Sequence, residues 1–396
     1  MKSILDTDLY KFTTAYAYMK LFPKSMCTFT FKDRNKVKRT PEFLKKYKEE
    51  LDTLKDLRFT DEEYAWCVYH IPEIPVSFWQ WLKGFHYSEL TPYLDEEGIL
   101  NVSVTDYTWK ASLYEIPTMS SIPEVNNRDK KINYEKLISD LDYKIALSNN
   151  SGMKFAEFGT RRRFNYEVQD IVIKRLKEKA QYCVGTSNVY LAMKYGMKPI
   201  GTHPHEWFMF HGAQFGYRNA NRIALQNWLK VYNGNLAVAL TDTYTSDVFF
   251  RNFTQELAKA YDGLRQDSGD EIEFINKAIG RYSELGIDYT KKSITFSNAL
   301  DFPKAIQILN YCTKKGINAN FGIGTNLTCD VYSPEGEKYP AENIVMKMSK
   351  CMLEVGDYWV PTIKISDDLG KHMGNDVEFN IASAQLYLNS DNYERI

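Results

Sequence analysis

The chain has 396 residues, of which 44% are hydrophobic and 26% are charged, so we expect a folded protein with more than one domain and little disorder. The net charge of −1 excludes a bulk attraction to nucleic acids or anionic membranes, so any bound phosphate must be held locally. We find no signal sequence, no apolar stretch approaching 18 residues and no C-x-x-C motif among the six cysteines. A cytoplasmic protein with reduced thiols is the resulting prediction.

The first 132 residues predict an N-terminal α+β domain. Apolar periodicity predicts helices over residues 9–22, 41–55 and 62–83. Alternating patterns predict strands over residues 26–31, 99–104 and 108–116. The polar segment Asn126–Lys131 marks the boundary of this domain. We expect the C-terminal segment 355–396, with strand-like pieces at 357–366 and 376–383, to rejoin it.

Residues 133–354 have the texture of a second, α/β domain, which opens with a helix over 134–148. Eight apolar runs in it end in polar turns: KFAEFGT, QYCVGTS, PIGTHPHEW, AVALTDT, GLRQDSGD, SITFSNA, NANFGIGTN and IVMKMSK. Helical patterns between them cover residues 166–179, 187–195, 219–232, 247–261, 271–285 and 303–315. Such alternation requires a parallel sheet, and eight units imply a barrel. The span is shorter than the roughly 250 residues of a typical barrel, so we expect an irregular, incomplete TIM-like α/β barrel.

Several polar motifs fall at the predicted carboxyl ends of these strands, where the working residues of α/β barrels lie. The glycine-rich turn 322–328 would let backbone N–H groups approach a phosphate, and residues 184–188 open a helix whose N-terminus suits an anion. Arg161, Arg162 and Arg163 follow another strand, and guanidinium groups bind phosphates and carboxylates bidentately. Each motif also has a structural explanation, as a tight turn or a solvated helix start. Their common position favours a phosphorylated substrate.

The motif GLRQDSGD places Arg265 beside Asp267. The arginine can hold a carboxylate substrate while the aspartate orients a sugar hydroxyl or a hydrated Mg²⁺, although an internal salt bridge would also explain the pair. The motif GTHPHEW carries His203 and His205, followed by Glu206, without a convincing third metal ligand. Most single histidines are structural, but a neutral imidazole beside a bound phosphate is a competent nucleophile, and a neighbouring carboxylate can fix its tautomer.

Nine segments form one ordered set along the chain. They are DLYKFTTAYAYMKLFP, FTFKDRN, EFGTRRRF, VGTSNVYLAMKYGMKPIGTHPHEWF, ALTDTYTSDVF, GLRQDSGD, TFSNALD, FGIGTNL and KISDDLGKHMG. Together they resemble the bacterial nicotinate phosphoribosyltransferases, of the type II phosphoribosyltransferase family. The resemblance implies an incomplete α/β barrel with an N-terminal domain, a homodimer whose active sites lie at the subunit interface, and a requirement for Mg²⁺. The implied reaction, in NAD biosynthesis and salvage, forms nicotinate mononucleotide and pyrophosphate from nicotinate and phosphoribosyl pyrophosphate, coupled to ATP hydrolysis.

The resemblance also implies roles for individual residues. His205 corresponds to a histidine that ATP transiently phosphorylates, whereas His203 receives no role. Nicotinate contacts are implied for Tyr10, contributed by the partner subunit and stacked on the pyridine ring, and for Phe158, Ser187, Thr202 and Arg265. Contacts to phosphoribosyl pyrophosphate are implied for Arg161, Asp267, Ser297, Asn298, Gly322, Gly324 and Thr325. The metal ligands stay open.

Ser187 favours nicotinate over nicotinamide as the base. Nicotinamide-using relatives carry an acidic residue at this position, which would repel a carboxylate substrate, whereas serine tolerates one. The alternatives are a nicotinamide or quinolinate phosphoribosyltransferase, a non-catalytic homologue, and a barrel lyase with a Schiff-base lysine. The lyase candidates are Lys347 and Lys364, for which we expect no apolar setting that lowers the pKa.

Overall fold

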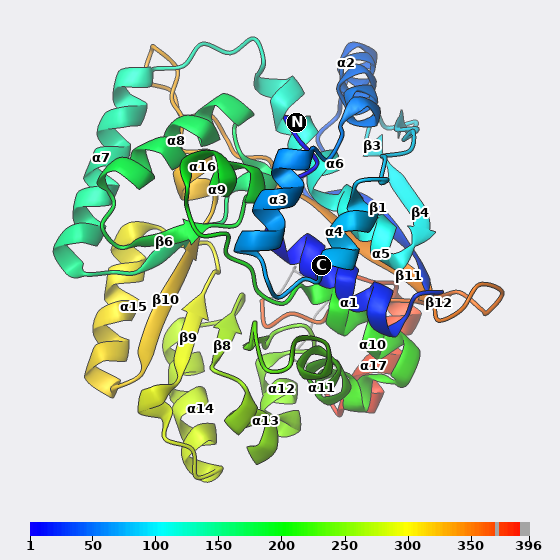
Figure 1. Ribbon diagram of the computed structural model, residues 1–396, viewed down its shortest axis with the longest axis vertical. Coiled ribbons are helices and arrows are strands. Elements are labelled where there is room, and N and C mark those ends of the chain that lie inside the picture. Colours follow the sequence, from blue (N-terminus) through cyan, green and yellow to red (C-terminus); the bar gives the residue numbers. More distant parts are fainter. Residues whose placement is uncertain (369–371, 389–396) are drawn as a thin grey trace.

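The protein is described by a computed structural model that covers residues 1–368 and 372–388. Two sheets organise the fold (Figure 1): a six-stranded parallel sheet and a four-stranded antiparallel sheet, with a two-stranded ribbon beside them. The predicted fold class, an α/β fold with an incomplete barrel and an N-terminal α+β part, is confirmed. No helix in the described part of the chain is long and apolar enough to cross a membrane.

The parallel sheet has the strand order β6-β5-β10-β9-β8-β7. Its strands are β5 (Phe155–Glu157), β6 (Cys183–Thr186), β7 (Val238–Leu240), β8 (Gly263–Gln266), β9 (Ser293–Phe296) and β10 (Asn318–Ile323). Among the described residues no strand pairing joins β6 to β7, so the barrel is open there. All carboxyl ends therefore lie along one curved edge.

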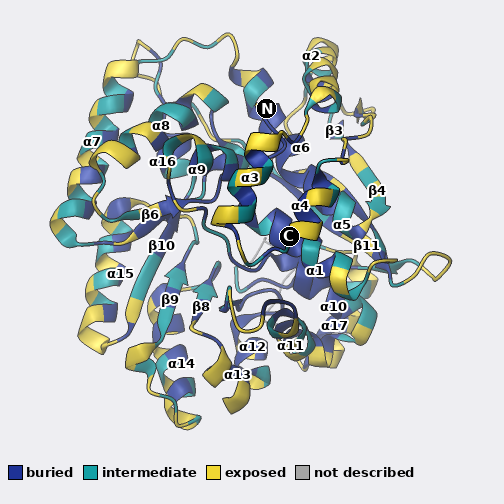
Figure 2. Ribbon diagram, viewed as in Figure 1, coloured by how far each residue is buried: buried dark blue, intermediate teal, exposed yellow. Residues whose placement is uncertain are grey.

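The helices of this half of the chain include those that cover the outside of the parallel sheet. In chain order they are α7 (Tyr134–Ser151), α8 (Tyr166–Lys179), α9 (Val189–Tyr195), α10 (His205–Phe215), α11 (Ala220–Tyr232), α12 (Ser246–Asn252), α13 (Gln255–Ala260), α14 (Glu271–Glu284), α15 (Phe302–Lys315) and α16 (Thr325–Thr328). Of these, α10 packs on β11 (Ile344–Met352) of the other sheet, and α16 is a short turn at the carboxyl end of β10. The outer helices bury one face and expose the other (Figure 2), as their apolar periodicity predicts. The predicted helix 247–261 is interrupted, because Thr254 Oγ1 accepts the Leu257 N–H and starts a new helix, α13.

The antiparallel sheet has the order β12-β11-β1-β4. Its strands are β1 (Met26–Asp33), β4 (Ser103–Tyr107), β11 (Ile344–Met352) and β12 (Val360–Pro361), while β2 (Tyr93–Leu94) and β3 (Leu100–Asn101) form the ribbon. The helices of this region are α1 (Leu9–Leu21), α2 (Pro41–Asp52), α3 (Asp61–His70), α4 (Val76–Leu82), α5 (Thr108–Ala111) and α6 (Glu115–Asn127). The polar segment Asn126–Lys131 spans the last two residues of α6 and the start of its connection to α7.

Two of the eight predicted barrel strands are wrong. The segment before His205 makes only one bridge to the sheet, between Pro199 and Thr186, because Pro199 and Pro204 lack the N–H donors that a ladder needs. Residues 344–352 form β11, which pairs antiparallel with β1. An apolar run predicts a strand but does not determine which sheet receives it.

Two further strand predictions are wrong. Residues 108–116 are helical and form α5, a short 3-10 turn and the start of α6. Because nearly all of them are buried, their apolar residues show no periodicity that distinguishes a helix from a strand. Residues 376–383 lie in α17 (Asp376–Leu386), which Asn375 caps by accepting the Glu378 N–H. Within the C-terminal segment 355–396, which we expected to rejoin the N-terminal domain, β12 belongs to the same sheet as β1. Residues 369–371 and 389–396 of this segment lie outside the described residues.

Candidate active site

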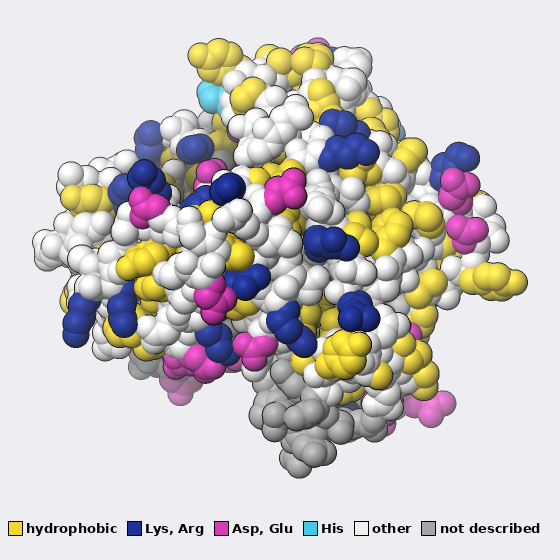
Figure 3. Space-filling view, turned by 90° about the horizontal axis from the view of Figure 1, so that it is seen from below, with side chains coloured by type: hydrophobic (Ala, Val, Ile, Leu, Met, Phe, Trp, Pro, Cys, Tyr) yellow, Lys and Arg dark blue, Asp and Glu magenta, His cyan; other side chains and the backbone are white. Residues whose placement is uncertain are grey.

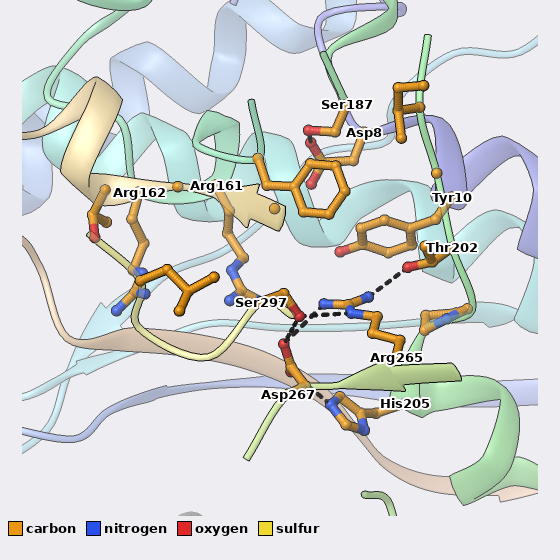
Figure 4. A pocket seen from close by; sticks show the side chains of 18 of the residues that line it. Asp8, Tyr10, Arg161, Arg162, Ser187, Thr202, His205, Arg265, Asp267 and Ser297 are labelled. Carbon is orange, nitrogen blue, oxygen red and sulfur yellow. Dashed lines mark hydrogen bonds and ion pairs between the residues drawn. The ribbon is translucent and has the colours of Figure 1, made fainter. Parts of the chain in front are cut away.

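A pocket opens at the carboxyl ends of the parallel strands (Figure 4). The residues that directly follow β5, β6, β8, β9 and β10 all contribute to it, and loop 200–204 with the start of α10 forms another wall. Twelve of the thirteen predicted site residues line this pocket: Tyr10, Phe158, Arg161, Ser187, Thr202, His205, Arg265, Asp267, Ser297, Gly322, Gly324 and Thr325. The exception is Asn298, which is not among the lining residues.

Tyr10 lines the pocket of its own chain, whereas the resemblance implied a tyrosine contributed by the partner subunit. The N-terminal segment lies against the end of β6, where Leu9 N–H donates to the Ser187 carbonyl at 2.8 Å. Gly201 allows this approach, since a Cβ there would lie 3.1 Å from the Tyr10 nitrogen. The Tyr10 hydroxyl and the guanidinium groups of Arg161 and Arg265 point toward one cavity (Figure 4).

The prediction of an anion site at the start of α9 is wrong. Its first N–H groups already have partners, since Val189 donates to the Thr7 carbonyl at 3.0 Å and Tyr190 to the Leu5 carbonyl at 2.9 Å. Asn188 Oδ1 accepts the next one, from Leu191, at 2.9 Å. The dipole of this short helix therefore anchors the N-terminal segment rather than a ligand.

The glycines of the turn 322–328 make room for Phe158. A Cβ at Gly322 would lie 2.3 Å from the Phe158 ring, and one at Gly324 would lie 3.0 Å from the Phe158 carbonyl oxygen. The ring therefore rests directly on the backbone of β10. Glycine is required here to position an aromatic wall of the pocket, which the sequence pattern alone did not reveal.

Arg265 is held rigidly at the end of β8. Its Nε donates to Ser297 Oγ at 2.8 Å and its Nη2 to Asp267 Oδ1 at 3.0 Å. Its Nη1 donates to Thr202 Oγ1 at 2.6 Å and, at 3.4 Å, to the His203 carbonyl. A guanidinium has five N–H donors, so one of them has no partner among the described residues. The site thus offers an oriented cation with remaining capacity for an anionic ligand (Figure 4).

His205 begins α10 in a group of charged side chains. Its Nε2 lies 3.1 Å from both Asp267 Oδ2 and Lys364 Nζ, and its Nδ1 lies 3.1 Å from Thr243 Oγ1. Burial and the Lys364 ammonium lower the pKa of His205 to about 4, against the opposing effect of Asp242, so the ring is neutral at physiological pH. A neutral imidazole with an oriented partner on each nitrogen is competent as a nucleophile.

The expectation that Glu206 orients His205 is wrong. The Glu206 carboxylate points away from the imidazole and pairs with Lys11 and with Ser112, whose hydroxyl donates to Oε1 at 2.5 Å. Consecutive helical residues differ by about 100° in direction, so neighbours in sequence cannot share one partner. Thr243 lies beside Nδ1, and Asp267 and Lys364 both lie beside Nε2.

One group of residues in the described chain, His205, Asp242 and Asp267, has ligand atoms close enough for a metal, within 4.8 Å of one another. Lys364 Nζ already lies 3.3 Å from Asp242 Oδ2 and 3.1 Å from His205 Nε2. This ammonium supplies the positive charge that the carboxylates require. The group therefore fits a lysine better than Mg²⁺, which prefers oxygen ligands and keeps several waters.

The three consecutive arginines have different environments. Arg161 and Arg162 line the pocket, and burial together with Arg161 and Arg34 lowers the pKa of Arg162 to about 10. Arg163 is buried and forms a two-pronged ion pair with Asp6, at 2.7 and 3.0 Å. Two cations thus face the cavity and one fastens the N-terminal segment.

Four charged lining residues are not among the thirteen predicted site residues: Asp8, Glu115, Arg162, which the sequence analysis named only as part of an arginine motif, and Lys347, which it named only as a lyase candidate. Lys347 comes from β11, and burial lowers its pKa to about 8, which corrects the expectation that no setting depresses it. Asp8 Oδ1 accepts the Ser187 hydroxyl at 2.6 Å, so a carboxyl group does stand beside the serine. Burial raises the pKa of Asp8 against the influence of Ser187 and Arg161.

His203 provides a stability prediction. Its ring is buried 4.4 Å from the Trp228 ring, its nitrogens have no hydrogen-bond partner among the described residues, and burial lowers its pKa to about 3. We expect His203→Phe to raise the free energy of unfolding by about 1–3 kcal/mol at pH 8, because two unsatisfied nitrogens are removed. Below pH 6.5 the wild-type unfolded state binds a proton that the folded state excludes, so the gain should grow by about 2 kcal/mol at pH 5.

Denaturant unfolding of wild type and variant at pH 8 and pH 5 measures this gain. The matched control is His211→Phe, which removes a ring whose nitrogens lie 2.7 Å from the Trp207 carbonyl and 3.0 Å from Asn227 Nδ2. That variant should lose stability at pH 8. A His203→Phe protein less stable than wild type at both pH values would contradict the prediction.

An α/β fold whose strand ends gather cations, aromatic rings and a neutral histidine around one cavity belongs to an enzyme of small anionic substrates. The Nicotinate phosphoribosyltransferase (NAPRTase) family model matches residues 153–391, and its N-terminal domain model matches residues 5–123. The chain belongs to the nicotinate phosphoribosyltransferase family.

Relatives match along nearly the whole chain. A nicotinate phosphoribosyltransferase from Chromohalobacter salexigens is 38% identical over 393 residues, which are 98% of this chain and 99% of the relative. The crystal structure of nicotinate phosphoribosyltransferase from Porphyromonas gingivalis is 41% identical with a TM-score of 0.95, covering 98% of this chain and all (100%) of that one. The structure from Vibrio cholerae is 32% identical with a TM-score of 0.90, covering 98% and 94%.

Proposed function

We propose that the chain joins nicotinate to phosphoribosyl pyrophosphate, forming nicotinate mononucleotide and pyrophosphate, and that ATP drives the step through phosphorylated His205. The observation that carries this proposal is the convergence of Arg265, Arg161 and His205 on one pocket at the strand ends. Family membership supplies the reaction, and the placement of NAD biosynthesis follows from the product.

Nicotinate fits the part of the pocket between Tyr10 and Phe158. Two aromatic rings can stack on a pyridine ring, and Arg265, fixed by Thr202 and Ser297, can bind its carboxylate. Ser187, whose hydroxyl donates to Asp8, adds a second polar group on this side of the pocket. The positive charge of Arg265 favours an anionic base over nicotinamide, which is neutral. This argues against the alternative of a nicotinamide phosphoribosyltransferase.

Phosphoribosyl pyrophosphate fits the remaining side of the pocket. Arg161 and Arg162 can neutralise its phosphates, and the backbone from Gly322 to Thr325 can contact the sugar phosphate. Asp267 lies toward the pocket with 22% of its side chain exposed, so it could hold Mg²⁺ together with the substrate's pyrophosphate. Bound there, Mg²⁺ would neutralise charge on the leaving group.

The displacement at the anomeric carbon needs orientation and charge stabilisation more than acid–base chemistry. The rings hold the pyridine nitrogen in line with the carbon–oxygen bond that breaks, which removes much of the entropic barrier. Pre-oriented arginines stabilise the negative charge that develops on pyrophosphate. Thr325 and Ser297 can position the ribose between these two groups.

ATP coupling is assigned to His205. With the proton on Nδ1 donated to Thr243, Nε2 attacks the γ-phosphorus, the bond to the β-phosphate oxygen breaks, and ADP leaves. The phosphoryl group adds about 1.5–2 negative charges, by analogy with other phosphorylated side chains. Lys364, 3.1 Å from Nε2, can pair with it. The new charge would reorganise the Asp267–Arg265 contacts that hold the substrates.

The remaining readings receive less support. Lys347 has the lowered pKa that a Schiff-base lyase needs, but Lys347 Nζ lies 3.5 Å from the Glu115 carboxylate, which favours a charged ammonium. A non-catalytic homologue would have no reason to retain the set of hydrogen bonds that orients Arg265.

Acidic and basic side chains are interspersed on the face seen from below (Figure 3), which does not suit nucleic acid. All six cysteines are free, as in a reducing, cytoplasmic compartment, and a homodimer with shared sites remains part of the proposal.

The decisive experiment is an assay for mononucleotide formation from nicotinate or nicotinamide, each with and without ATP, in Mg²⁺. We expect product from nicotinate only, and faster formation with ATP. Nicotinamide used as well as nicotinate would contradict the base assignment, whereas equal rates with and without ATP would contradict the coupling alone. EDTA should stop the reaction, which tests the metal requirement.

A further inference from the structure

A buried lysine lies directly beneath the pocket. Lys11 is fully buried and pairs with two buried carboxylates, Glu206 and Glu115. Each of these three residues has an immediate connection to the cavity: Lys11 follows Tyr10, Glu206 follows His205, and Glu115 lines the pocket itself. One ammonium thus connects three elements that carry pocket residues, α1, α10 and α6.

The first turns of α1 and α10 place their residues in the same way relative to the cavity. In each helix one residue of the first turn faces the cavity and the next residue, turned by about 100°, points below it. The two lower residues, Lys11 and Glu206, form an ion pair. The Tyr18 hydroxyl also donates to the Glu206 carbonyl at 3.1 Å, which adds a second link between the same helices.

The Lys11 ammonium is fixed from several sides. It lies 5.1 Å from the centroid of the Phe29 ring and 5.2 Å from that of Tyr10, so it contacts the ring of the proposed nicotinate site directly. Ser112 Oγ lies 3.4 Å from it and also donates to Glu206 at 2.5 Å. A buried charge with this many partners is costly to displace, so its position defines that of its neighbours.

Glu115 shares the same ammonium with other cations of the pocket. Its Oε1 lies 3.5 Å from Lys347 Nζ and 3.7 Å from an Arg161 nitrogen. Burial would raise the pKa of Glu115, but Lys11, Lys347 and Arg161 outweigh it and lower the pKa to about 2. Glu115 therefore stays ionised and keeps the pocket's cations oriented.

We propose that Lys11 is a positioning residue for the reaction: its pair with Glu206 fastens the first turn of α1 to the first turn of α10 and thereby holds the Tyr10 ring at the distance from His205 and Arg265 that nicotinate requires. Lys11 does not line the pocket, so it acts through Tyr10. This inference rests on the proposed placement of nicotinate against Tyr10.

A double-mutant cycle of Tyr10→Ala and Lys11→Met tests the inference, with the KM for nicotinate and kcat measured for each variant. Methionine keeps the aliphatic stem and removes the charge. We expect each single variant to lower kcat/KM for nicotinate by about 100-fold, as misplacement by an ångström does. The double variant should be no worse than Tyr10→Ala alone, because the ring that Lys11 positions is then absent.

A second variant separates positioning from stability. Lys11→Met leaves Glu206 buried without its cation, so its melting temperature should fall by several degrees. In Lys11→Met combined with Glu206→Gln that carboxylate is neutral, and the melting temperature should recover. The KM for nicotinate should stay at least about tenfold raised, since the link between the helices is still missing.

The matched control is Arg39→Met. Arg39 is also a largely buried cation between two carboxylates, at 2.7 Å from Glu342 and 3.6 Å from Asp33, but none of the three lines the pocket. This variant should lose stability and keep the wild-type KM for nicotinate.

Every outcome of the cycle decides the inference. A wild-type KM in Lys11→Met, effects of Tyr10→Ala and Lys11→Met that multiply, or a KM that recovers together with the melting temperature would each overturn it. If Tyr10→Ala is impaired and Lys11→Met is not, the proposed function stands and only the inference fails. If Tyr10→Ala is unimpaired, the placement of nicotinate fails, and with it a role of Lys11 through Tyr10.

Discussion

Replacing His205 with alanine is expected to make the rates of mononucleotide formation with and without ATP equal. The variant lacks the nitrogen that receives the phosphoryl group, whereas the pocket residues that orient nicotinate and phosphoribosyl pyrophosphate remain in place. Steady-state kinetics at saturating and zero ATP measures the effect, and ³²P transfer from γ-labelled ATP to the protein should disappear. Retained stimulation with full labelling would show that His205 is not the acceptor.

His203→Phe is the matched control for this experiment. It removes an imidazole two residues away that does not line the pocket, so ATP stimulation and labelling should persist. The pH dependence gives a further check. Because His205 has a pKa of about 4, falling pH protonates Nε2 only near pH 4, and labelling of the wild type should be sustained at pH 5.5. A histidine with an ordinary pKa near 6.5 would already be mostly protonated there.

Replacing Arg265 with lysine is expected to lower kcat/KM for nicotinate by about 10- to 100-fold. Lysine keeps the charge but cannot form the planar contacts to Ser297, Thr202 and Asp267, so the cation loses its orientation toward the carboxylate. A charged hydrogen bond contributes about 1.5–3 kcal/mol, which sets this range. Turnover of nicotinamide, if measurable, should fall much less, because it lacks the carboxylate.

The corresponding control is Arg281→Lys. The Arg281 guanidinium also makes a forked contact, to the Phe253 carbonyl at 2.9 and 3.3 Å, but it lies outside the pocket. Its replacement should leave kcat/KM for nicotinate within about twofold of wild type, as expected for a surface change. An equal loss in both variants would mean that Arg265 acts through general stability rather than through the carboxylate.

Local sequence patterns predicted the parallel strands well because each apolar run is followed, at the same edge of the sheet, by a turn that contains polar residues or glycine. Arg265 lies near the end of β8, and Asp267 and Ser297 are the first residues after β8 and β9, so a correct strand pattern places them together. Asn298 follows the same strand as Ser297 but does not line the pocket, because the chain bends at residues 298 and 299, where Ala299 has a φ of 46°.

The periodicity of the sequence could not reveal which distant segments contribute residues to the pocket and its surroundings. Glu115 lies in a buried helical region that the sequence pattern wrongly predicted as a strand. Lys347 lies on β11, which was predicted in the barrel but pairs with β1 in the antiparallel sheet. Lys11 is a charged residue in an apolar helix, and its partners, Glu115 and Glu206, lie 104 and 195 residues away. Only the assembled fold shows that these groups compensate one another.

The place of β11 constrains how the molecule can be assembled. β1, formed by residues 26–33, has β4 on one side and β11, formed by residues 344–352, on the other. During synthesis β1 cannot pair with β11 until most of the polypeptide has left the ribosome. Until then the backbone N–H and C=O groups along that edge of β1 have no partner from β11. Closing so long a loop is slow, and an unpaired strand edge can pair with another chain, so we expect an incomplete chain to be prone to aggregate at this strand.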